Sequence, residues 1–152
     1  MKPTVYFATD HAGFALKNVL LAYVRDELGY NVVDCGPSTY DAQDDYPDFI
    51  SVAAEKISHS PKNRAIILGG SGQGEAMVAN RYAGVRATVY YGGVPEILTL
   101  SREHNDANIL SLGARFLEDD EAKKIVATWL RGTFSGEERH IRRIKKIEHL
   151  KQ

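Results

Sequence analysis

Short apolar segments alternate with longer stretches of helical periodicity along the whole chain. The first segment, residues 4–9, is apolar and β-branched and ends at Asp10, which is typical of a buried strand. From Phe14 to Leu28, apolar residues recur three and four positions apart, and Gly29 stands where a left-handed residue commonly ends a helix. The beginning of the chain therefore predicts a strand followed by an amphipathic helix.

The same unit of strand and helix repeats to the end of the chain. Further strands are expected at residues 30–34, 65–68, 87–91 and 108–112, a loop at 36–45, and helices from Pro47, from about 75, after Pro95, at about 119–130 and at about 137–151. Parallel strands need crossover helices, which cover both faces of their sheet. The pattern predicts an α/β fold, a three-layer α/β/α sandwich with a Rossmann-like five-stranded parallel sheet, in a single domain over residues 1–152.

Composition and charge narrow the possible partners. The chain has 19 Lys and Arg against 20 Asp and Glu, so its net charge of -1 provides no overall field for nucleic acid or an anionic membrane. No apolar run approaches the roughly 18 residues that a membrane span needs, and the N-terminus does not resemble a signal peptide. The single Cys35 excludes an intrachain disulfide and is expected to be a buried structural thiol. We expect a cytoplasmic protein.

The segment 69–75, GGSGQGE, follows the third predicted strand, and ligands of parallel sheets bind at this end of the strands. A nucleotide-binding P-loop would need Lys and Ser or Thr where Glu75 and Ala76 stand, and a dinucleotide site would need a different glycine spacing. Backbone N–H donors beside a carboxylate suit abstraction of a proton next to a carbonyl group, with Glu75 as the base and the donors stabilising an enediolate oxygen. The alternative is that Glu75 only complements the helix dipole.

Other candidates are polar residues near the remaining strand ends. Asp10 and His11 follow the first strand and are either site residues or ordinary turn and cap residues. His104 and Asn105 precede the fifth strand, where an imidazole suits acid–base chemistry but is also common at a solvated helix end. Arg115 follows the fifth strand, a favourable place for an anion-binding side chain.

The last predicted helix carries basic residues on its apolar side. At about 100° per residue, Arg139, His140 and Arg143 fall in one arc of about 140° together with Ile144 and Ile147. We expect this side to face inward, where two arginines would need an anion such as a phosphate group. The alternatives are salt bridges to glutamates or a solvated charged face.

Six motifs occur together in a fixed order. They are Asp10-His11-Ala12-Gly13, Asp45-Tyr46-Pro47, the segment 69–75, Arg102-Glu103-His104-Asn105, Gly113-Ala114-Arg115 and Arg139-His140-x-x-Arg143. In these motifs, over nearly all of its length, the chain resembles the ribose-5-phosphate isomerase B family, the group that includes the galactose-6-phosphate isomerase subunits. The resemblance implies interconversion of ribose 5-phosphate and ribulose 5-phosphate through an enediolate after ring opening, with no metal and no cofactor.

The resemblance also implies a role for each site residue. Glu75 would be the base, and the oxyanion site would be formed by Ser71 and the backbone of Gly70, Gly72, Gln73 and Gly74. His104, assisted by Asp10, would open the sugar ring, and Asn105 would bind the sugar. The phosphate would be bound by His11, Arg115, Arg139 and Arg143, and the pocket would be lined by Tyr46 and His140. Members of the family form homodimers, sometimes paired into tetramers, whose active sites draw on both subunits, so the helix at 137–151 is expected to reach the partner. Many members carry a catalytic cysteine at the position of Gly69, and its absence here places the chemistry on Glu75.

Two other functions stay open at this point. A six-carbon phosphate such as allose or galactose 6-phosphate would require only a modest change in pocket length. A non-catalytic, flavodoxin-like phosphate-binding module is the alternative from another class. A receiver module of that kind would need an acidic cluster after the first strand and a lysine after the last, whereas His11 and Gly113-Ala114 occupy those places.

Overall fold

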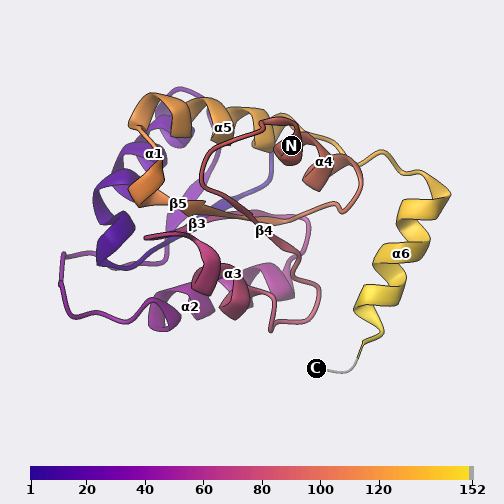
Figure 1. Cartoon of the computed structure of the whole chain (residues 1–152), viewed down its shortest axis with the longest axis horizontal. Helices are drawn as coiled ribbons and strands as arrows, with labels where there is room; N and C mark the ends of the chain where they lie inside the picture. The colour runs from indigo at the N-terminus through magenta and orange to yellow at the C-terminus, as the bar shows by residue number, and fades with distance from the viewer. Residues whose placement is uncertain (151–152) are drawn as a thin grey trace.

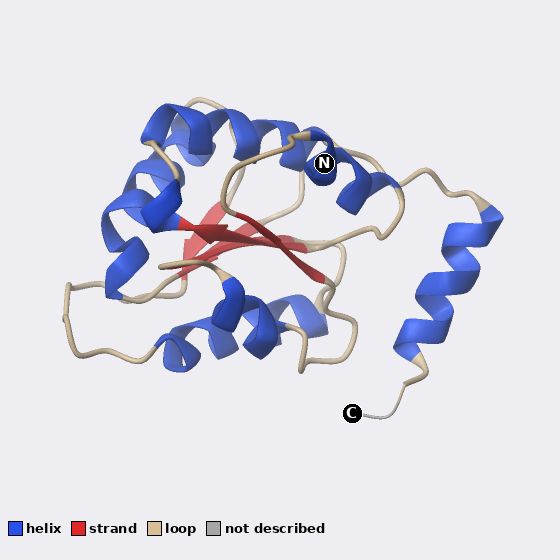
Figure 2. Cartoon of the chain, in the orientation of Figure 1, coloured by secondary structure: helices blue, strands red, loops and turns tan. Residues whose placement is uncertain are grey.

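The computed structural model describes residues 1–150 and has a five-stranded parallel sheet between two layers of helices (Figure 1, Figure 2). The strands follow the order β2-β1-β3-β5-β4. The bounds are β1 Val5–Ala8, α1 Phe14–Asp26, β2 Val32–Asp34, α2 Tyr46–His59, β3 Arg64–Gly69, α3 Gln73–Ala79, β4 Ala87–Tyr90, α4 Glu96–Glu103, β5 Ile109–Gly113, α5 Asp119–Arg131 and α6 Glu138–Glu148, with short 3-10 helices η1 His11–Gly13 and η2 Ala114–Phe116. The predicted fold class is confirmed.

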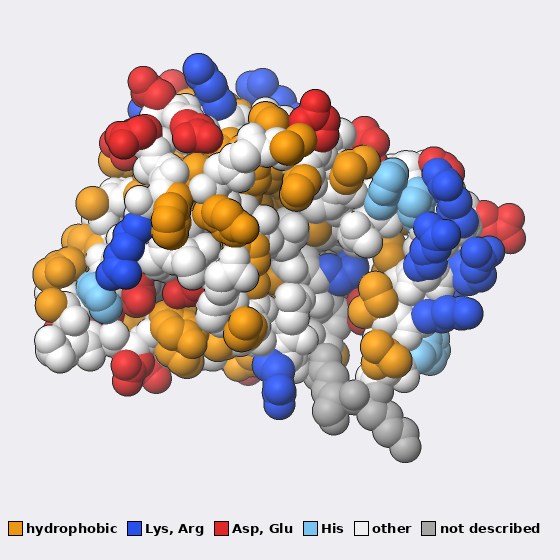
Figure 3. Space-filling model, viewed as in Figure 1, with side chains coloured by type: hydrophobic (Ala, Val, Ile, Leu, Met, Phe, Trp, Pro, Cys, Tyr) orange, Lys and Arg blue, Asp and Glu red, His pale blue; other side chains and the backbone are white. Residues whose placement is uncertain are grey.

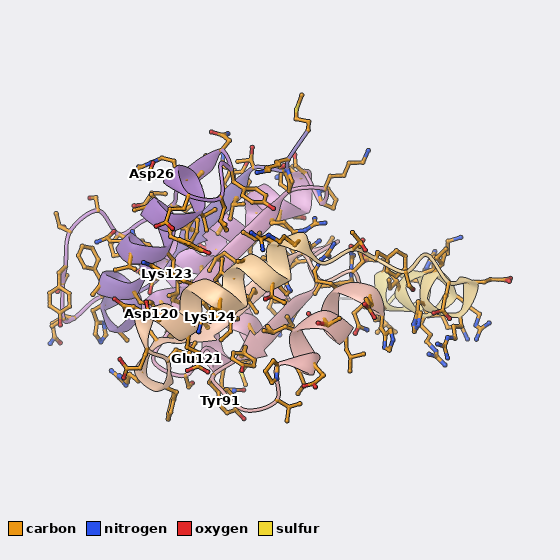
Figure 4. All side chains as sticks on the ribbon, turned by 90° about the horizontal axis from the view of Figure 1, so that it is seen from above. Asp26, Tyr91, Asp120, Glu121, Lys123 and Lys124 are labelled. Atoms are coloured by element: carbon orange, nitrogen blue, oxygen red, sulfur yellow. The ribbon has the colours of Figure 1, made fainter. Side chains whose placement is uncertain are left out.

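Two hydrophobic cores lie on opposite faces of the sheet. Helices α1, α4 and α5 pack on one face around Phe7, Leu110 and the fully buried Trp129. Helices α2 and α3 cover the other face over Ile50 and Ile67. Figure 4 shows the outer side of α5, where Asp120, Glu121, Lys123 and Lys124 point away from the sheet, as expected for an amphipathic covering helix.

The strand register brings the loops that follow β1, β3 and β5 to one edge of the sheet. Gly69 at the end of β3 pairs with Gly113 at the end of β5, while Ala65 and Ile109 pair at the opposite edge. At about 3.3 Å per residue, the two ends of β5 are roughly 13 Å apart. A residue that precedes β5 therefore lies far from one that follows it.

Helix α6 departs from the compact arrangement of the other helices. It stands beside the body beyond β4 and α4 (Figure 1) and ends at Glu148, so the predicted helix is too long at residues 149–150, while residue 151 lies outside the described residues. Gly29, which the sequence predicts to end the first helix, follows α1 with φ +69°, the left-handed conformation expected at a helix C-terminus. Within residues 1–150 no helix combines the length and apolar character that crossing a bilayer requires.

Candidate active site

The loop between β3 and α3 is shaped by glycines that admit close neighbours. Gly72 has φ +79°, which favours glycine, and its carbonyl accepts a 2.7 Å hydrogen bond from the buried Ser111 hydroxyl. The Ser71 hydroxyl accepts from the Gln73 backbone N–H at 3.3 Å. A Cβ on Gly74 would lie 2.6 Å from the Tyr46 hydroxyl. The predicted loop residues thus surround the start of α3 together with Tyr46.

Glu75 lies in the first turn of α3, and its carboxyl group occupies the space beside Gly69. The residue is only 4% exposed. A Cβ added to Gly69 would lie 2.5 Å from Oε2 of Glu75 and closer still to Oε1. The glycine at position 69 therefore provides the room that the carboxyl group of Glu75 requires.

Burial raises the pKa of Glu75 above its usual value. The Glu75 backbone N–H lowers this pKa by hydrogen bonding, and the negative charge of Asp10 raises it further, so burial decides the direction. A carboxylate with a raised pKa is a stronger base than an exposed one, and general bases work best when their pKa approaches the operating pH. The sequence alone does not determine the direction of this pKa shift.

Asp10 lies near Glu75 just after β1, and His11 follows it at the start of η1. Asp10 Oδ1 accepts a 3.0 Å hydrogen bond from the Ala12 N–H and so caps η1, which makes it a cap residue as well as a neighbour of the base. His11 contacts Asp44 through both its backbone N–H and its ring. Ligating atoms of Asp10, His11 and Asp44 lie within 4.8 Å of one another. Hydrogen bonds between His11 and Asp44 explain much of this closeness, and we assign no metal site there.

Arg115 completes the group at this edge of the sheet. Its backbone N–H donates to the Gly70 carbonyl at 3.2 Å, and a Cβ on Gly70 would lie 2.9 Å from its guanidinium Nη1. Asp10, His11, Glu75 and Arg115 are therefore gathered with the glycine loop, as the positions of the strand ends predict, and Tyr46 joins them from the start of α2.

The remaining predicted residues lie at the opposite edge of the sheet. His104 caps the C-terminus of α4, and Asn105 follows it ahead of β5. The His104 and His140 rings are stacked with centroids 4.3 Å apart. His140 is buried, which together with the neighbouring His104 lowers its pKa, and its Nε2 has no hydrogen-bond partner among the described residues. This second group is separated from Glu75 by at least the length of β5.

The expectation that Arg139 and Arg143 face inward is wrong within this chain. Both are exposed, and Arg139 Nε donates to a Glu137 carboxylate oxygen at 2.8 Å. Of the three basic residues on this side of α6, only His140 is buried. The helical periodicity identifies a common face, but α6 stands off the body, so most of that face has no surface of the same chain to cover it.

A cavity of about 700 Å³ lies between α6 and the body. Ile147 of α6 and Leu150 just after it line the cavity, and Figure 3 shows hydrophobic side chains along the hollow and Lys and Arg side chains over α6. Glu148 spans it by accepting hydrogen bonds from Arg86 Nη1 at 2.7 Å and from the Gly84 N–H at 3.2 Å. The apolar side of α6 thus remains partly uncovered.

Some residues at the first group were not predicted. Asp44 belongs to a loop without periodicity, and its contact with His11 is not visible in the sequence. Tyr91, labelled in Figure 4, and Phe116 form an exposed edge-to-face pair with centroids 6.1 Å apart just after β4 and β5. Cys35, expected to be buried, is partly exposed, and burial still raises the pKa of its thiol, which disfavours the reactive thiolate.

Comparison with known proteins gives the same family throughout. The model of the family described as Ribose/Galactose Isomerase matches residues 5–147. The probable ribose-5-phosphate isomerase B of Mycoplasma genitalium is 40% identical over 148 residues, which cover 97% of this chain and 95% of that protein. The ribose-5-phosphate isomerase B of Mycobacterium tuberculosis is 38% identical over 140 residues, which cover 92% of this chain and 85% of that protein. The crystal structure of the Mycoplasma genitalium enzyme with bound ribulose-5-phosphate superposes with a TM-score of 0.90, covering 97% of this chain and 95% of that one.

These matches span nearly the whole chain at identities well above the level at which only a fold is shared. The solved Trypanosoma cruzi type B ribose 5-phosphate isomerase agrees as well, with 41% identity and a TM-score of 0.89 over 97% of this chain and 95% of its own. The chain therefore belongs to the ribose/galactose isomerase family.

Proposed function

We propose that this protein is an aldose–ketose isomerase that interconverts ribose 5-phosphate and ribulose 5-phosphate. The observation that carries the proposal is the buried Glu75 carboxyl group, held in the space beside Gly69 at the start of a helix and next to a loop of backbone donors. Relatives named ribose-5-phosphate isomerase B and the related structure with bound ribulose-5-phosphate support the five-carbon substrate.

In the proposed mechanism, Glu75 takes the proton from C2 of the open-chain aldose and returns it to C1, while the hydroxyl proton passes from O2 to O1. Negative charge then develops on the enediolate oxygens, where the Ser71 hydroxyl and the N–H groups of residues 70–74 stabilise it. The raised pKa of Glu75 favours both the abstraction and the return of the proton. Neither step requires a metal or a cofactor.

We further propose that the active site is shared between two copies of the chain in a homodimer. His104, Asn105, Arg139 and Arg143 lie at the opposite edge of the sheet from Glu75, so within one chain they cannot reach the same sugar. In a symmetric dimer the second group of one copy can complete the first group of the other. This arrangement gives the exposed arginines a phosphate to bind and the uncovered side of α6 a surface to pack on.

In this dimer, His104 acts as the acid that opens the furanose ring with help from Asp10, and Asn105 binds the sugar. His11 and Arg115 of one copy and Arg139 and Arg143 of the other bind the phosphate. Tyr46 and His140 line the pocket. Pairing of dimers into a tetramer and a cytoplasmic location remain predictions.

A six-carbon sugar phosphate is the second candidate substrate, because the matching family is described as covering ribose and galactose isomerases. The test is turnover of ribose 5-phosphate by the wild type and by Glu75→Gln, each with and without EDTA, with galactose 6-phosphate and allose 6-phosphate assayed in parallel. Glu27→Gln, at an exposed position that ends α1, is the matched control. Turnover of ribose 5-phosphate that survives EDTA, persists in the control and collapses in Glu75→Gln is expected. A folded but inactive wild type would refute the pentose assignment.

A further inference from the structure

The loop between β2 and α2 places an acidic residue against His11. Asp44 Oδ1 accepts a 2.9 Å hydrogen bond from the His11 backbone N–H and lies 2.7 Å from the ring Nδ1. One oxygen therefore contacts both polar groups on the same side of His11. The loop is anchored at its beginning by the buried Lys17, whose ammonium group donates to the Asp34 carboxylate and to the Pro37 carbonyl at 2.8 Å.

Burial makes the contact between Asp44 and His11 more than a surface ion pair. The Asp44 side chain is 7% exposed, and within residues 1–150 its Oδ2 is buried without a hydrogen-bond partner. A buried carboxylate with one unpaired oxygen is unfavourable unless a positive charge lies beside it. The His11 ring, 27% exposed, is the group placed to supply that charge.

The geometry also determines which nitrogen of the ring remains available. A carboxylate oxygen only accepts, so Nδ1 must carry a proton to donate to Asp44. Nε2, across the ring, then faces away from Asp44 and is the nitrogen left for a ligand. The Tyr40 ring makes a T-shaped contact with the His11 ring, with centroids 6.4 Å apart and planes at 89°, which further restricts how the imidazole can turn.

The charged groups around His11 come from three segments. Asp44 faces it from the loop before α2, Asp10 from the end of β1, and Arg115 from η2. The hydrogen bond to Asp44 is the main reason that the pKa of His11 is raised; Asp10 raises it further, while partial burial and Arg115 lower it. The effect of the two carboxylates on the pKa of His11 therefore exceeds the opposite effect of Arg115.

We propose that Asp44 is a positioning residue for substrate binding, holding the His11 ring through Nδ1 so that Nε2–H donates to the phosphate group of the sugar phosphate. This inference rests on the proposed function, in which His11 contacts the phosphate. Asp44 does not touch the substrate and acts only through His11.

The pairing has a specific consequence for pH dependence. When His11 is neutral, Asp44 keeps the proton on Nδ1, and the bare Nε2 presents a lone pair that repels a phosphate oxygen. Only the imidazolium form donates from Nε2. Asp44 therefore extends phosphate binding to higher pH, and Asp44→Asn, which keeps an acceptor oxygen but removes the charge, should shorten that range.

The first test compares KM and kcat for ribose 5-phosphate across pH in the wild type, Asp44→Asn and Asp41→Asn. Asp41 is the control because it lies exposed in the same loop and, among residues 1–150, its side chain accepts from the Gln43 N–H alone, an acceptor role that asparagine retains. We expect KM of Asp44→Asn to rise by roughly tenfold near neutral pH, about the weight of one charge-assisted hydrogen bond. The difference in KM between Asp44→Asn and the wild type should vanish toward about pH 5, where His11 is charged in both proteins. kcat should stay within about twofold.

The second test observes the ring directly in the ligand-free wild type, so its readout does not depend on catalytic activity. Nitrogen–proton correlation spectra resolve the tautomer and pKa of each histidine ring, and His11→Asn identifies the signals of His11. We expect the Nδ1–H tautomer in the neutral form, a pKa above the ordinary 6.5, and a shift of the ring signals on adding inorganic phosphate.

The outcomes separate this inference from the proposed function. An Nε2–H tautomer in the wild type, or a KM for Asp44→Asn that follows the wild type at every pH, would overturn the role of Asp44. A raised pKa with the Nδ1–H tautomer and a response to phosphate, in a protein that does not isomerise ribose 5-phosphate, would uphold the pair and reject the pentose activity alone.

Discussion

The fit between Gly69 and Glu75 can be tested by adding a single methyl group. Gly69 is outside the left-handed region of φ, so Gly69→Ala is compatible with its backbone conformation. The new Cβ would nevertheless meet the Glu75 carboxyl group, 2.5 Å from Oε2 and nearer to Oε1. The change therefore acts on the position of the proposed base and leaves its chemical identity intact.

The distance sets the size of the expected effect. Non-bonded heavy atoms pack at about 3.5–4.0 Å, so the carboxyl group must move by at least about 1 Å. A misplacement of that size can lower a rate by about 10²-fold. Overpacking a core costs about 1–3 kcal/mol, and the lower end applies here because the obstructing atoms are the end of a side chain that can rotate. We expect kcat/KM to fall by about 10²-fold while the free energy of unfolding falls by only about 1 kcal/mol.

A double-mutant cycle separates this route from general damage. kcat/KM for ribose 5-phosphate is measured in Gly69→Ala, in Glu75→Gln and in the double variant, with denaturant unfolding of each. If Gly69 matters only because it leaves room for the carboxylate, the double variant should be no less active than Glu75→Gln alone. Retention of activity within about threefold by Gly69→Ala, or multiplied losses in the double variant, would refute the reasoning.

Three further predictions concern charge and assembly. Because burial raises the pKa of Glu75, the ionised carboxylate destabilises the fold above that pKa, and this penalty fades as the pH falls toward the ordinary 4.5. The melting temperature of Glu75→Gln should therefore exceed that of the wild type at neutral pH, and the difference should narrow on acidification. Wild-type kcat/KM should fall as the pH drops through the raised pKa. Equimolar refolding of Glu75→Gln with His104→Gln, each of which should be inactive alone, should restore about a quarter of wild-type activity, because half of the dimers are mixed and each mixed dimer has one intact site. If mixed dimers form without recovery of activity, a shared site is excluded. Lys17→Met should lower the free energy of unfolding by about 1–3 kcal/mol in a denaturant titration, because it leaves the Pro37 carbonyl without its buried donor.

The sheet and the first group of site residues were predictable because their signals are local. Each strand end is marked where apolar residues give way to polar ones, and parallel strands bring those ends to one edge, so Asp10, Glu75 and Arg115 could be grouped from their positions alone. Asp44 could not, because its contact with His11 joins two loops separated by 33 residues. No periodicity constrains such a contact.

The error over Arg139 and Arg143 has a physical cause that points beyond one chain. Periodicity specifies which residues of a helix share a face, and the stacked, buried His140 shows that this face of α6 does begin to pack. It does not specify which molecule covers the rest, where Ile147 is 48% and Leu150 70% exposed. Because His104 is part of that same stack, whatever surface closes over α6 also encloses the proposed ring-opening acid. In the proposed dimer, assembly and completion of the active site are one event, and a variant that weakens the packing of α6 should lose turnover and dimerisation together.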